Sequence, residues 1–231
     1  MKVMLLAAGR GERMRPLTDL IPKPLLEAGG KPLIEWHIDR LASAGLTDLI
    51  INHAHLGQQI EVALGDGKRF GVSIHYSAER TALETAGGIA NVLHLLGNTP
   101  FAVINADVYC NYDFARLPEL AAQLRLGQDS AHLVMVNNPE QHPKGDFGLH
   151  DGRIIDDTPR LTFSGIGIYS PTLFKAITPG DIAPLAPLLR EQIAQGKVSG
   201  EHFKGYWVDV GTPQRLQQLD NALRAPHNTG H

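Results

Sequence analysis

The sequence predicts an α/β fold in which a mixed, mostly parallel central sheet is flanked by helices on both faces. Two observations support this prediction: strand and helix patterns alternate through the first half of the chain, and the expected strands are short, continuous apolar runs. The chain has 231 residues, of which 43% are hydrophobic and 19% are charged. This length and composition suit one domain with an extensive core, so we expect a single domain over residues 1–231.

The first half of the chain alternates regularly between the two kinds of element. The segment "PLIEWHIDRLASA" (32–44) has apolar residues at helical spacing and is followed by Gly45, a residue type that often ends helices. Parallel sheets bind ligands beyond the carboxyl ends of their strands, which makes the loops after Leu6 and Ile104 candidate sites. We expect strands at 3–7, 49–52, 72–76 and 101–104, and helices at 32–44, 58–64 and 86–96.

The second half is less regular, but no linker, repeat or low-complexity segment separates it from the first. We therefore expect the two halves, about 1–112 and 113–224, to share one sheet, followed by a disordered tail over 225–231. The expected elements are helices at 114–125, 184–195 and 213–224, strands at 131–136, 161–169 and 207–210, and a hairpin over 147–155 that turns at Asp151-Gly152.

Charge and cysteine content narrow the classes of partner. The net charge is −3 and the isoelectric point is about 6.4, which argues against a nucleic-acid or membrane-surface partner. Cys110 is the single cysteine, so an intrachain disulfide is excluded. Charged residues from Arg10 onward interrupt the apolar start, unlike a signal peptide, and no apolar stretch is long enough for a transmembrane helix. We expect a cytoplasmic protein and leave its oligomeric state open.

The stretch "LLAAGRGERMRPLT" (Leu5–Thr18) carries the strongest functional signal. Glycines directly after a strand allow close approach of the backbone to a ligand, and loop N–H groups with arginines can hold an anion. A dinucleotide-binding fingerprint is excluded because Met14 stands where its third glycine should be, and no P-loop pattern is present. The loop therefore predicts a phosphate-binding cradle of another kind, with a glycine-rich turn bearing solvated arginines as the alternative.

The longer pattern "LAAGRGERMRPLT…PKPL" resembles the signature of sugar-1-phosphate nucleotidyltransferases, and "NADV" (105–108), "FSGIGIYSP" (163–171) and "GYWVDVGTP" (205–213) are similar to further segments of that family. The resemblance implies a Rossmann-like fold of the glycosyltransferase-A-like kind. It also implies that a sugar 1-phosphate and a nucleoside triphosphate are the small-molecule substrates and that pyrophosphate is released. The first half would then bind the nucleotide and the second half the sugar.

The same resemblance assigns the catalytic charges. Arg13 matches the family arginine that faces the triphosphate, and Lys23, held between two prolines, matches the lysine that contacts the reacting phosphate. One anion must approach another in this reaction, so positioning and charge neutralisation are what catalysis requires. Asp107 and Asp209 match the two metal-binding aspartates, which implies Mg²⁺ as the cofactor. The alternative for each aspartate is a polar residue that ends a strand.

The resemblance also places substrate contacts. Glu84 departs from the family, in which glycine is usual at that position, so the base preference is open. The usual Glu-Lys-Pro before the "FSGI" strand is missing, so Lys144 and Arg160 are candidates by position for binding an additional acidic group on the sugar. The implied nucleotide-binding residues are Ala7, Ala8, Gly9, Gly11, Arg15, Glu79, Glu84 and Gly88, and the implied sugar-binding residues are Asn52, Asn105, Asp146 and Ser164.

Several segments, including "INHAHLGQQIE" (51–61), "LETAGG" (83–88) and "KGDF" (144–147), are similar to one branch of the family. That branch transfers uridylyl groups from UTP to N-acetylmuramate 1-phosphate in cell-wall recycling. Mannose-1-phosphate guanylyltransferases and other hexose-1-phosphate nucleotidyltransferases are the alternatives, as is a non-catalytic regulatory subunit of related fold. His53 and His55 could suggest zinc, but their spacing in a loop favours polar lining over a metal site.

Overall fold

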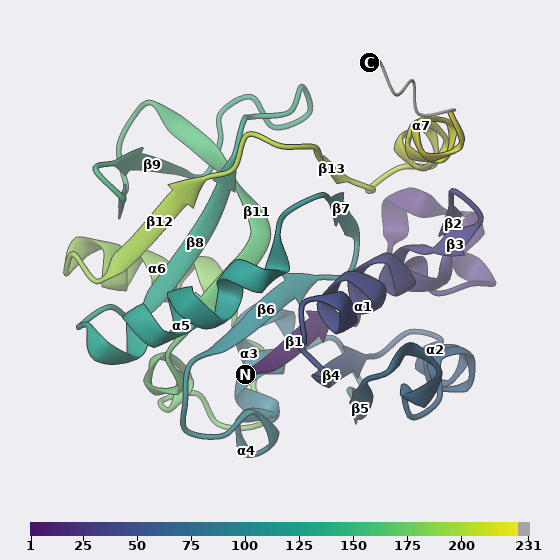
Figure 1. The fold of residues 1–231 in the computed structure, drawn as a ribbon, viewed down its shortest axis with the longest axis horizontal. Helices are drawn as coiled ribbons and strands as arrows, with labels where there is room; N and C mark the ends of the chain where they lie inside the picture. Colours follow the sequence, from purple (N-terminus) through teal and green to yellow (C-terminus); the bar gives the residue numbers. More distant parts are fainter. Residues whose placement is uncertain (226–231) are drawn as a thin grey trace.

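Within residues 1–225, which the computed structural model describes, nine strands form one central sheet (Figure 1). Their order is β5-β4-β1-β6-β11-β8-β12-β10-β9, so strands from both halves of the chain belong to it. The strands are β1 (Lys2–Leu6), β4 (Asp48–His53), β5 (Ser73–Ala78), β6 (Phe101–Asn105), β8 (Ala131–Val136), β9 (Phe147–His150), β10 (Arg153–Ile155), β11 (Arg160–Tyr169) and β12 (Val198–His202).

The sheet is mixed, and its neighbouring strands pair differently in the two halves of the chain. The neighbouring strands β5, β4, β1 and β6 are parallel, as the alternating sequence pattern predicts. β11 is antiparallel to both β6 and β8 and so joins the halves, with Ile166 opposite Ile104. β12 is parallel to β8, whereas the β9–β10 hairpin at the edge is antiparallel. The parallel order therefore holds through the first half and gives way to mixed pairing in the second.

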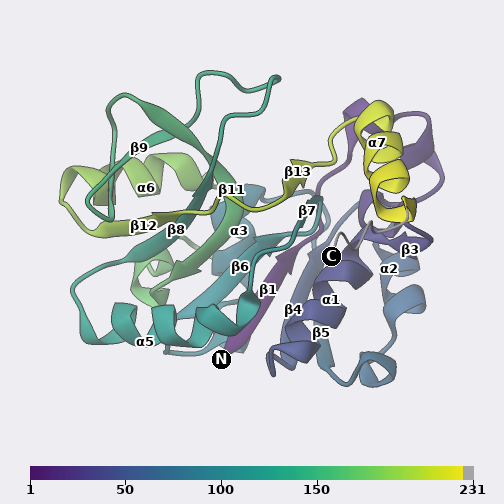
Figure 2. The same ribbon diagram turned by 45° about the horizontal axis from the view of Figure 1, so that its top comes forward.

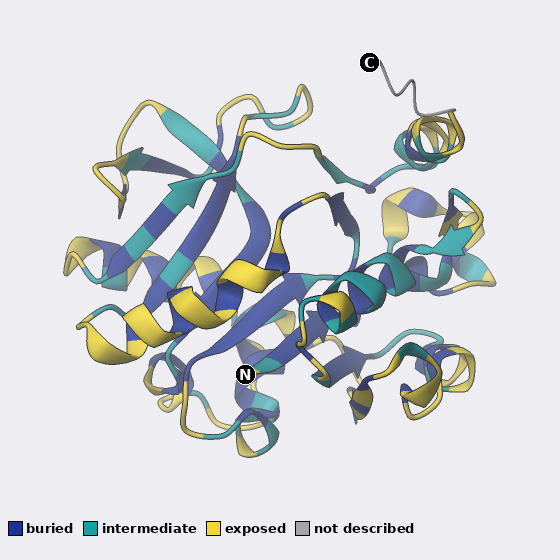
Figure 3. Cartoon of the chain, viewed as in Figure 1, coloured by how far each residue is buried: buried dark blue, intermediate teal, exposed yellow. Residues whose placement is uncertain are grey.

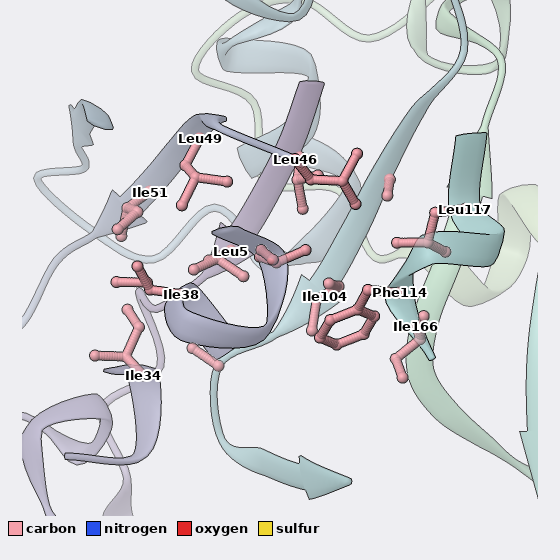
Figure 4. Packing of buried hydrophobic residues seen from close by; sticks show 14 of the residues in the cluster. Leu5, Ile34, Ile38, Leu46, Leu49, Ile51, Ile104, Phe114, Leu117 and Ile166 are labelled. Carbon is pink, nitrogen blue, oxygen red and sulfur yellow. The ribbon is translucent and has the colours of Figure 1, made fainter. Parts of the chain in front are cut away.

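Helices cover both faces of the sheet, as predicted, and alternate residues of each strand pack against them. On one face Leu5 packs with Ile38 and Leu117 in a large buried cluster (Figure 4). On the other face Met4 packs with Ile89 and Leu189. The inner strands β1, β4, β6 and β8 are accordingly buried along most of their length (Figure 3). The helices of the first face are α1 (Leu33–Ser43), α2 (Gly57–Leu64) and α5 (Leu117–Leu126), and those of the second are α3 (Glu84–Asn91), α4 (Leu93–Leu96) and α6 (Leu185–Ala194).

A third, smaller cluster attaches the last helix, α7 (Pro213–Arg224). Leu219 of α7 packs with Met14 and Leu33, beside the two-stranded β2–β3 ribbon (Glu27–Ala28 and Lys31–Pro32) (Figure 2). The Gly29 N–H donates to Asp220 Oδ1 at 2.8 Å and fixes this contact. The helix therefore lies beside the glycine-rich loop, although the two are at opposite ends of the chain.

The structure also contains elements that the sequence pattern did not predict. β12 was missed because "VSGEH" is polar and contains a glycine, and β7 (Val108–Cys110) because it follows the previous strand too closely. β7 pairs with β13 (Trp207–Asp209) in a separate two-stranded sheet. The expected helix over 86–96 is interrupted at Val92. The tail expected over 225–231 lies, beyond residue 225, outside the described residues.

Candidate active site

Two adjoining pockets open at the carboxyl ends of β1, β4 and β6, where the sequence predicts a site. The first has a volume of about 290 Å³ and the second about 180 Å³. Asn105, the last residue of β6, and Asp107, two residues further on, line both. The first pocket is lined further by Leu6, Ala7, Ala8, Gly9, Lys23, Pro24, Asn52, Glu79, Ala82, Glu84 and Thr85, and the second by Val108, Pro139, Gln141, His142, Thr162, Phe163, Ser164, Gly165, Trp207 and Asp209.

A buried polar network forms one wall of the first pocket. The Ala7 N–H donates to Asn52 Oδ1 at 3.0 Å, and Asn52 Nδ2 donates to Glu79 Oε1 at 2.7 Å. Glu79 Oε2 accepts the Leu83 N–H at 3.0 Å, so both carboxylate oxygens have partners. A Cβ atom on Gly88 would lie 3.0 Å from Asn52 Nδ2 and from Glu79 Oε1, so this position needs glycine. Asn52, assigned from the sequence to the sugar, thus lies in the first pocket, and Gly88 lies behind its wall.

The glycine-rich loop runs beside the first pocket and is held in shape by its own contacts. Gly11 has φ +70°, a left-handed conformation that favours glycine, and its carbonyl accepts the Thr18 hydroxyl at 2.9 Å. Arg15 is exposed and forms an ion pair with Asp19 at 2.9 Å. Gly11, Arg13 and Arg15 lie next to the pocket rather than in its lining. The loop backbone from Ala7 to Gly9 forms the lining itself.

Lys23 meets Asp107 where the two pockets join. The Lys23 side chain is 8% exposed, and its Nζ donates to Asp107 Oδ2 at 2.6 Å. Pro22 and Pro24 restrict the backbone on either side, so the ammonium group is held in place before any substrate arrives. A buried cation thus lies next to a carboxylate that is 40% exposed.

Asp209 lies beside two arginines. Its Oδ2 accepts from Arg215 at 2.9 Å, and the Arg215 side chain is 13% exposed. A Cβ atom on Gly211 would lie 3.0 Å from an Arg13 nitrogen and 3.1 Å from Asp209 Oδ1, so Arg13 and Asp209 converge on this glycine. Sequence reasoning missed Arg215. One signal could have revealed it. The helix dipole disfavours an arginine in the first turn of a helix, so an arginine at that position suggests that a nearby negative charge holds it there.

The pairing of β7 with β13 brings the two aspartates together. The Val210 N–H donates to the Asp107 carbonyl at 3.0 Å, and both carboxylates line the second pocket. Behind them, buried His37 donates from Nε2 to the Val108 carbonyl at 2.7 Å. Burial lowers the pKa of His37 to about 4, so it is neutral at physiological pH. It therefore supports the backbone next to Asp107 without adding charge.

The carboxylate oxygens of Asp107 and Asp209 are ligands of the kind that Mg²⁺ prefers. Within residues 1–225, no group of three or more His, Cys, Asp or Glu side chains could hold a metal ion. His53 instead lies 2.7 Å from Glu61, and His55 lies 2.6 Å from Arg10. The residues present thus fit a cation that takes two carboxylates from the protein and its other ligands from phosphate and water.

Glu84 has an unusual backbone at the rim of the first pocket. Its φ is +63°, in the left-handed region that favours glycine, and it is the first residue of α3. Glycine adopts this conformation without strain, which explains why the family usually has glycine at this position. The side chain is exposed and lines the pocket, so the departure introduces a carboxylate at the entrance.

The second pocket is bounded by the loop that joins β8 to β9. Asp146, predicted to contact the sugar, accepts the Phe163 N–H at 2.8 Å and lies 3.0 Å from His142 Nε2. His142 lines the pocket, whereas Asp146 stands behind it. Ser164, which the sequence assigns to the sugar, lines the second pocket. The sequence assigns no role to His142, because no local pattern shows that this loop lines a pocket.

Comparison with known proteins identifies the family. Residues 2–153 match the family model described as nucleotidyl transferase. A relative from Neisseria meningitidis, named N-acetylmuramate alpha-1-phosphate uridylyltransferase, is 53% identical over 94% of this chain and 96% of its own. A mannose-1-phosphate guanyltransferase from Hypocrea jecorina is 28% identical over 93% of this chain and 62% of its own. The solved structure of a Bacillus anthracis protein assigned as a glucose-1-phosphate thymidylyltransferase superimposes with a TM-score of 0.85 at 24% identity, covering 100% of this chain and 98% of that one.

In the part of the chain that the structure describes, no helix combines the length and apolar character that crossing a membrane requires.

Proposed function

The chain belongs to the nucleotidyl transferase family, and we propose that it transfers the uridylyl group of UTP to N-acetylmuramate 1-phosphate, forming UDP-N-acetylmuramate and pyrophosphate. The observation that carries this proposal is the 53% identity to a relative of that name over nearly the full length of both chains. The adjoining pockets support it, because the reaction needs a nucleotide and a sugar phosphate to meet at one point. In this proposal the first pocket takes UTP and the second the sugar phosphate.

The proposed reaction is a displacement at phosphorus. An oxygen of the sugar phosphate attacks the α-phosphorus of UTP, a new P–O bond forms, and the bond to the oxygen that bridges to the β-phosphorus breaks. Pyrophosphate leaves with the electron pair. Lys23, fixed where the pockets join, neutralises charge on the reacting phosphates. Arg13 and Arg215 both lie close to Gly211. In this proposal their positive charges attract the β- and γ-phosphates of UTP.

We further propose that Mg²⁺ binds Asp107 and Asp209. When bound, the ion screens phosphate charge and aligns the two substrates. The protein's own part is to hold both carboxylates on paired strands, with the Asp107 carbonyl fixed by the Val210 N–H. The Ala7–Gly9 backbone and the buried Asn52–Glu79 pair shape the base side of the first pocket. Residues 1–112 then form the nucleotide half and residues 113–224 the sugar half of one cytoplasmic enzyme that serves peptidoglycan recycling.

Mannose-1-phosphate guanylyl transfer is the second candidate, because more distant relatives carry that name. The deciding experiment measures pyrophosphate release with Mg²⁺ for UTP, GTP, dTTP and CTP, each with N-acetylmuramate, N-acetylglucosamine, mannose and glucose 1-phosphates. We expect strong release for UTP with N-acetylmuramate 1-phosphate. Release confined to GTP with mannose 1-phosphate would refute the proposal, and no release with any pair would favour a non-catalytic subunit.

A further inference from the structure

The second pocket contains a histidine for which the transfer reaction itself has no use. His142 lies on the loop between β8 and β9 and lines the pocket beside Gln141. We propose that His142, together with Gln141, binds a carboxylate carried by the acceptor sugar 1-phosphate, and so distinguishes acidic acceptor sugars from neutral ones. This inference rests on the proposed function and specifies how its acceptor is selected.

The loop that carries His142 is fixed to β11, so the ring is positioned before a ligand binds. Asn138 Nδ2 donates to the Arg160 carbonyl at 2.9 Å, and the Asp146 N–H donates to the Leu161 carbonyl at 2.8 Å. Gly145 has φ +60°, and a Cβ atom there would lie 2.7 Å from Asn138 Oδ1. The loop is therefore closely packed against the strand at both of its ends.

Three other polar residues of the second pocket already have partners. The Thr162 hydroxyl donates to Asn138 Oδ1 at 2.9 Å, and Trp207 Nε1 donates to the Ser164 carbonyl at 2.9 Å. The Ser164 hydroxyl oxygen accepts the Ile166 N–H at 3.1 Å. On the β8–β9 loop side of the pocket, the Gln141 amide and the His142 ring are the groups that can donate to an additional anionic group.

The lining of the second pocket contains both acidic groups and a histidine. Asp107 and Asp209 would repel a carboxylate, whereas His142 comes from the β8–β9 loop and already pairs with Asp146. Because His142 Nε2 is bonded to Asp146, Nδ1 is the ring atom that remains for a ligand. In the proposed complex the His142 ring carries a proton on both nitrogens, so that Nε2 donates to Asp146 and Nδ1 donates to the ligand carboxylate; such charge-assisted bonds are stronger than neutral ones.

The two candidates suggested by sequence position do not line this pocket. Lys144 is exposed, and the Arg160 guanidinium donates to Asp156 Oδ1 at 2.9 Å. Neither is among the residues that form the pocket wall. The assignment therefore moves from Lys144 and Arg160 to His142 and Gln141, two to three residues away from the lysine along the same loop.

The test compares an acidic with a neutral acceptor. Wild type, His142→Ala and His142→Gln are assayed with UTP and either N-acetylmuramate 1-phosphate or N-acetylglucosamine 1-phosphate, and Kd values for both sugars are measured by calorimetry. His150→Gln is the matched control, because His150 is an exposed histidine of β9 whose ring lies 3.2 Å from Asp151. We expect His142→Ala to raise KM and Kd for the acidic acceptor by roughly tenfold to a hundredfold, the scale of one charged hydrogen bond. kcat, the constants for the neutral acceptor and the thermal midpoint should change little.

Two results would overturn the inference alone: an equal loss with both acceptors, which would indicate a structural role for the loop, or no loss with either. A wild-type enzyme that uses the neutral acceptor but not N-acetylmuramate 1-phosphate would instead refute the proposed function, and the inference with it. The wild-type measurement therefore separates the two failures.

Discussion

Replacing Lys23 by methionine separates catalysis from stability. Methionine keeps an unbranched side chain in a position where the lysine is 8% exposed, and removes the ammonium group that lies 2.6 Å from Asp107. We expect kcat with UTP and N-acetylmuramate 1-phosphate to fall at least about a hundredfold, the scale of one electrostatic catalytic group. At about 1.36 kcal/mol per tenfold, that loss corresponds to roughly 2.7 kcal/mol of transition-state stabilisation.

The same substitution should affect folding far less. Asp107 is 40% exposed, so water screens the ion pair, and its contribution to the free energy of unfolding is about 1 kcal/mol or less. For a chain of this size that corresponds to a change in Tm of about 2–4 °C. Pyrophosphate release and scanning calorimetry on the same samples measure both effects.

The matched control is Lys68→Met, since Lys68 is 87% exposed and pairs with Asp66 away from the pockets. It should leave both kcat and Tm near the wild-type values. If Lys23→Met retained kcat within about threefold of wild type, Lys23 would have no part in the chemistry. If it instead unfolded the protein, the lysine would be structural and the assignment of a catalytic charge would fail.

Three further predictions test the site and its support. Glu84→Gly should be about 1 kcal/mol more stable than Glu84→Ala, because glycine relieves the left-handed φ of +63° and alanine does not; equal Tm values in calorimetry would contradict this strain. Asp107→Asn and Asp209→Asn should each raise the Mg²⁺ concentration for half-maximal activity by roughly tenfold, and a shift in one variant alone would exclude a site shared by both carboxylates. Because burial lowers the folded-state pKa of His37 to about 4, the unfolded state binds more protons between pH 6.5 and 4; the free energy of unfolding should therefore fall by roughly 3 kcal/mol over that range, and urea titrations should show a smaller fall for His37→Asn.

Most of the fold could be predicted because local patterns and long-range packing agree. The segment around Ile34 and Ile38 has the 3.6-residue period of a helix, and these residues do face the sheet (Figure 4). β12 could not be predicted in this way, because its pairing with β8 depends on backbone hydrogen bonds and not on an apolar pattern. A short strand that contains polar residues and a glycine leaves little trace in composition.

The candidate site could be predicted in part, because some of its residues follow strands directly. Asn105 ends β6 and Asp107 comes shortly after it, and both line the pockets. Asn52 could also be predicted as a site residue, because it lies near the end of a strand. Its hydrogen bonds to Ala7 and Glu79 place it in the first pocket and not in the second, and this could not be predicted, because it depends on which strands are neighbours. His142 could not be predicted, because its position in the pocket depends on the conformation of the loop between β8 and β9.

The charges of the site show why sequence identifies candidate catalytic residues more readily than their partners. Lys23 and Asp107 come from different loops, and Asp209 and Arg215 from a strand and the helix that follows it, yet each pair lies within hydrogen-bonding distance. An unpaired charged side chain in a partly buried site is costly, so a charged residue at such a site is usually paired with a residue of opposite charge. The partner can come from any element that the fold brings close, and no motif spacing records it. Arg215 satisfies Asp209 from the first turn of α7, where a cation is otherwise unfavourable. The attachment of α7 to the β2–β3 ribbon is therefore part of the site, because it determines where that arginine lies.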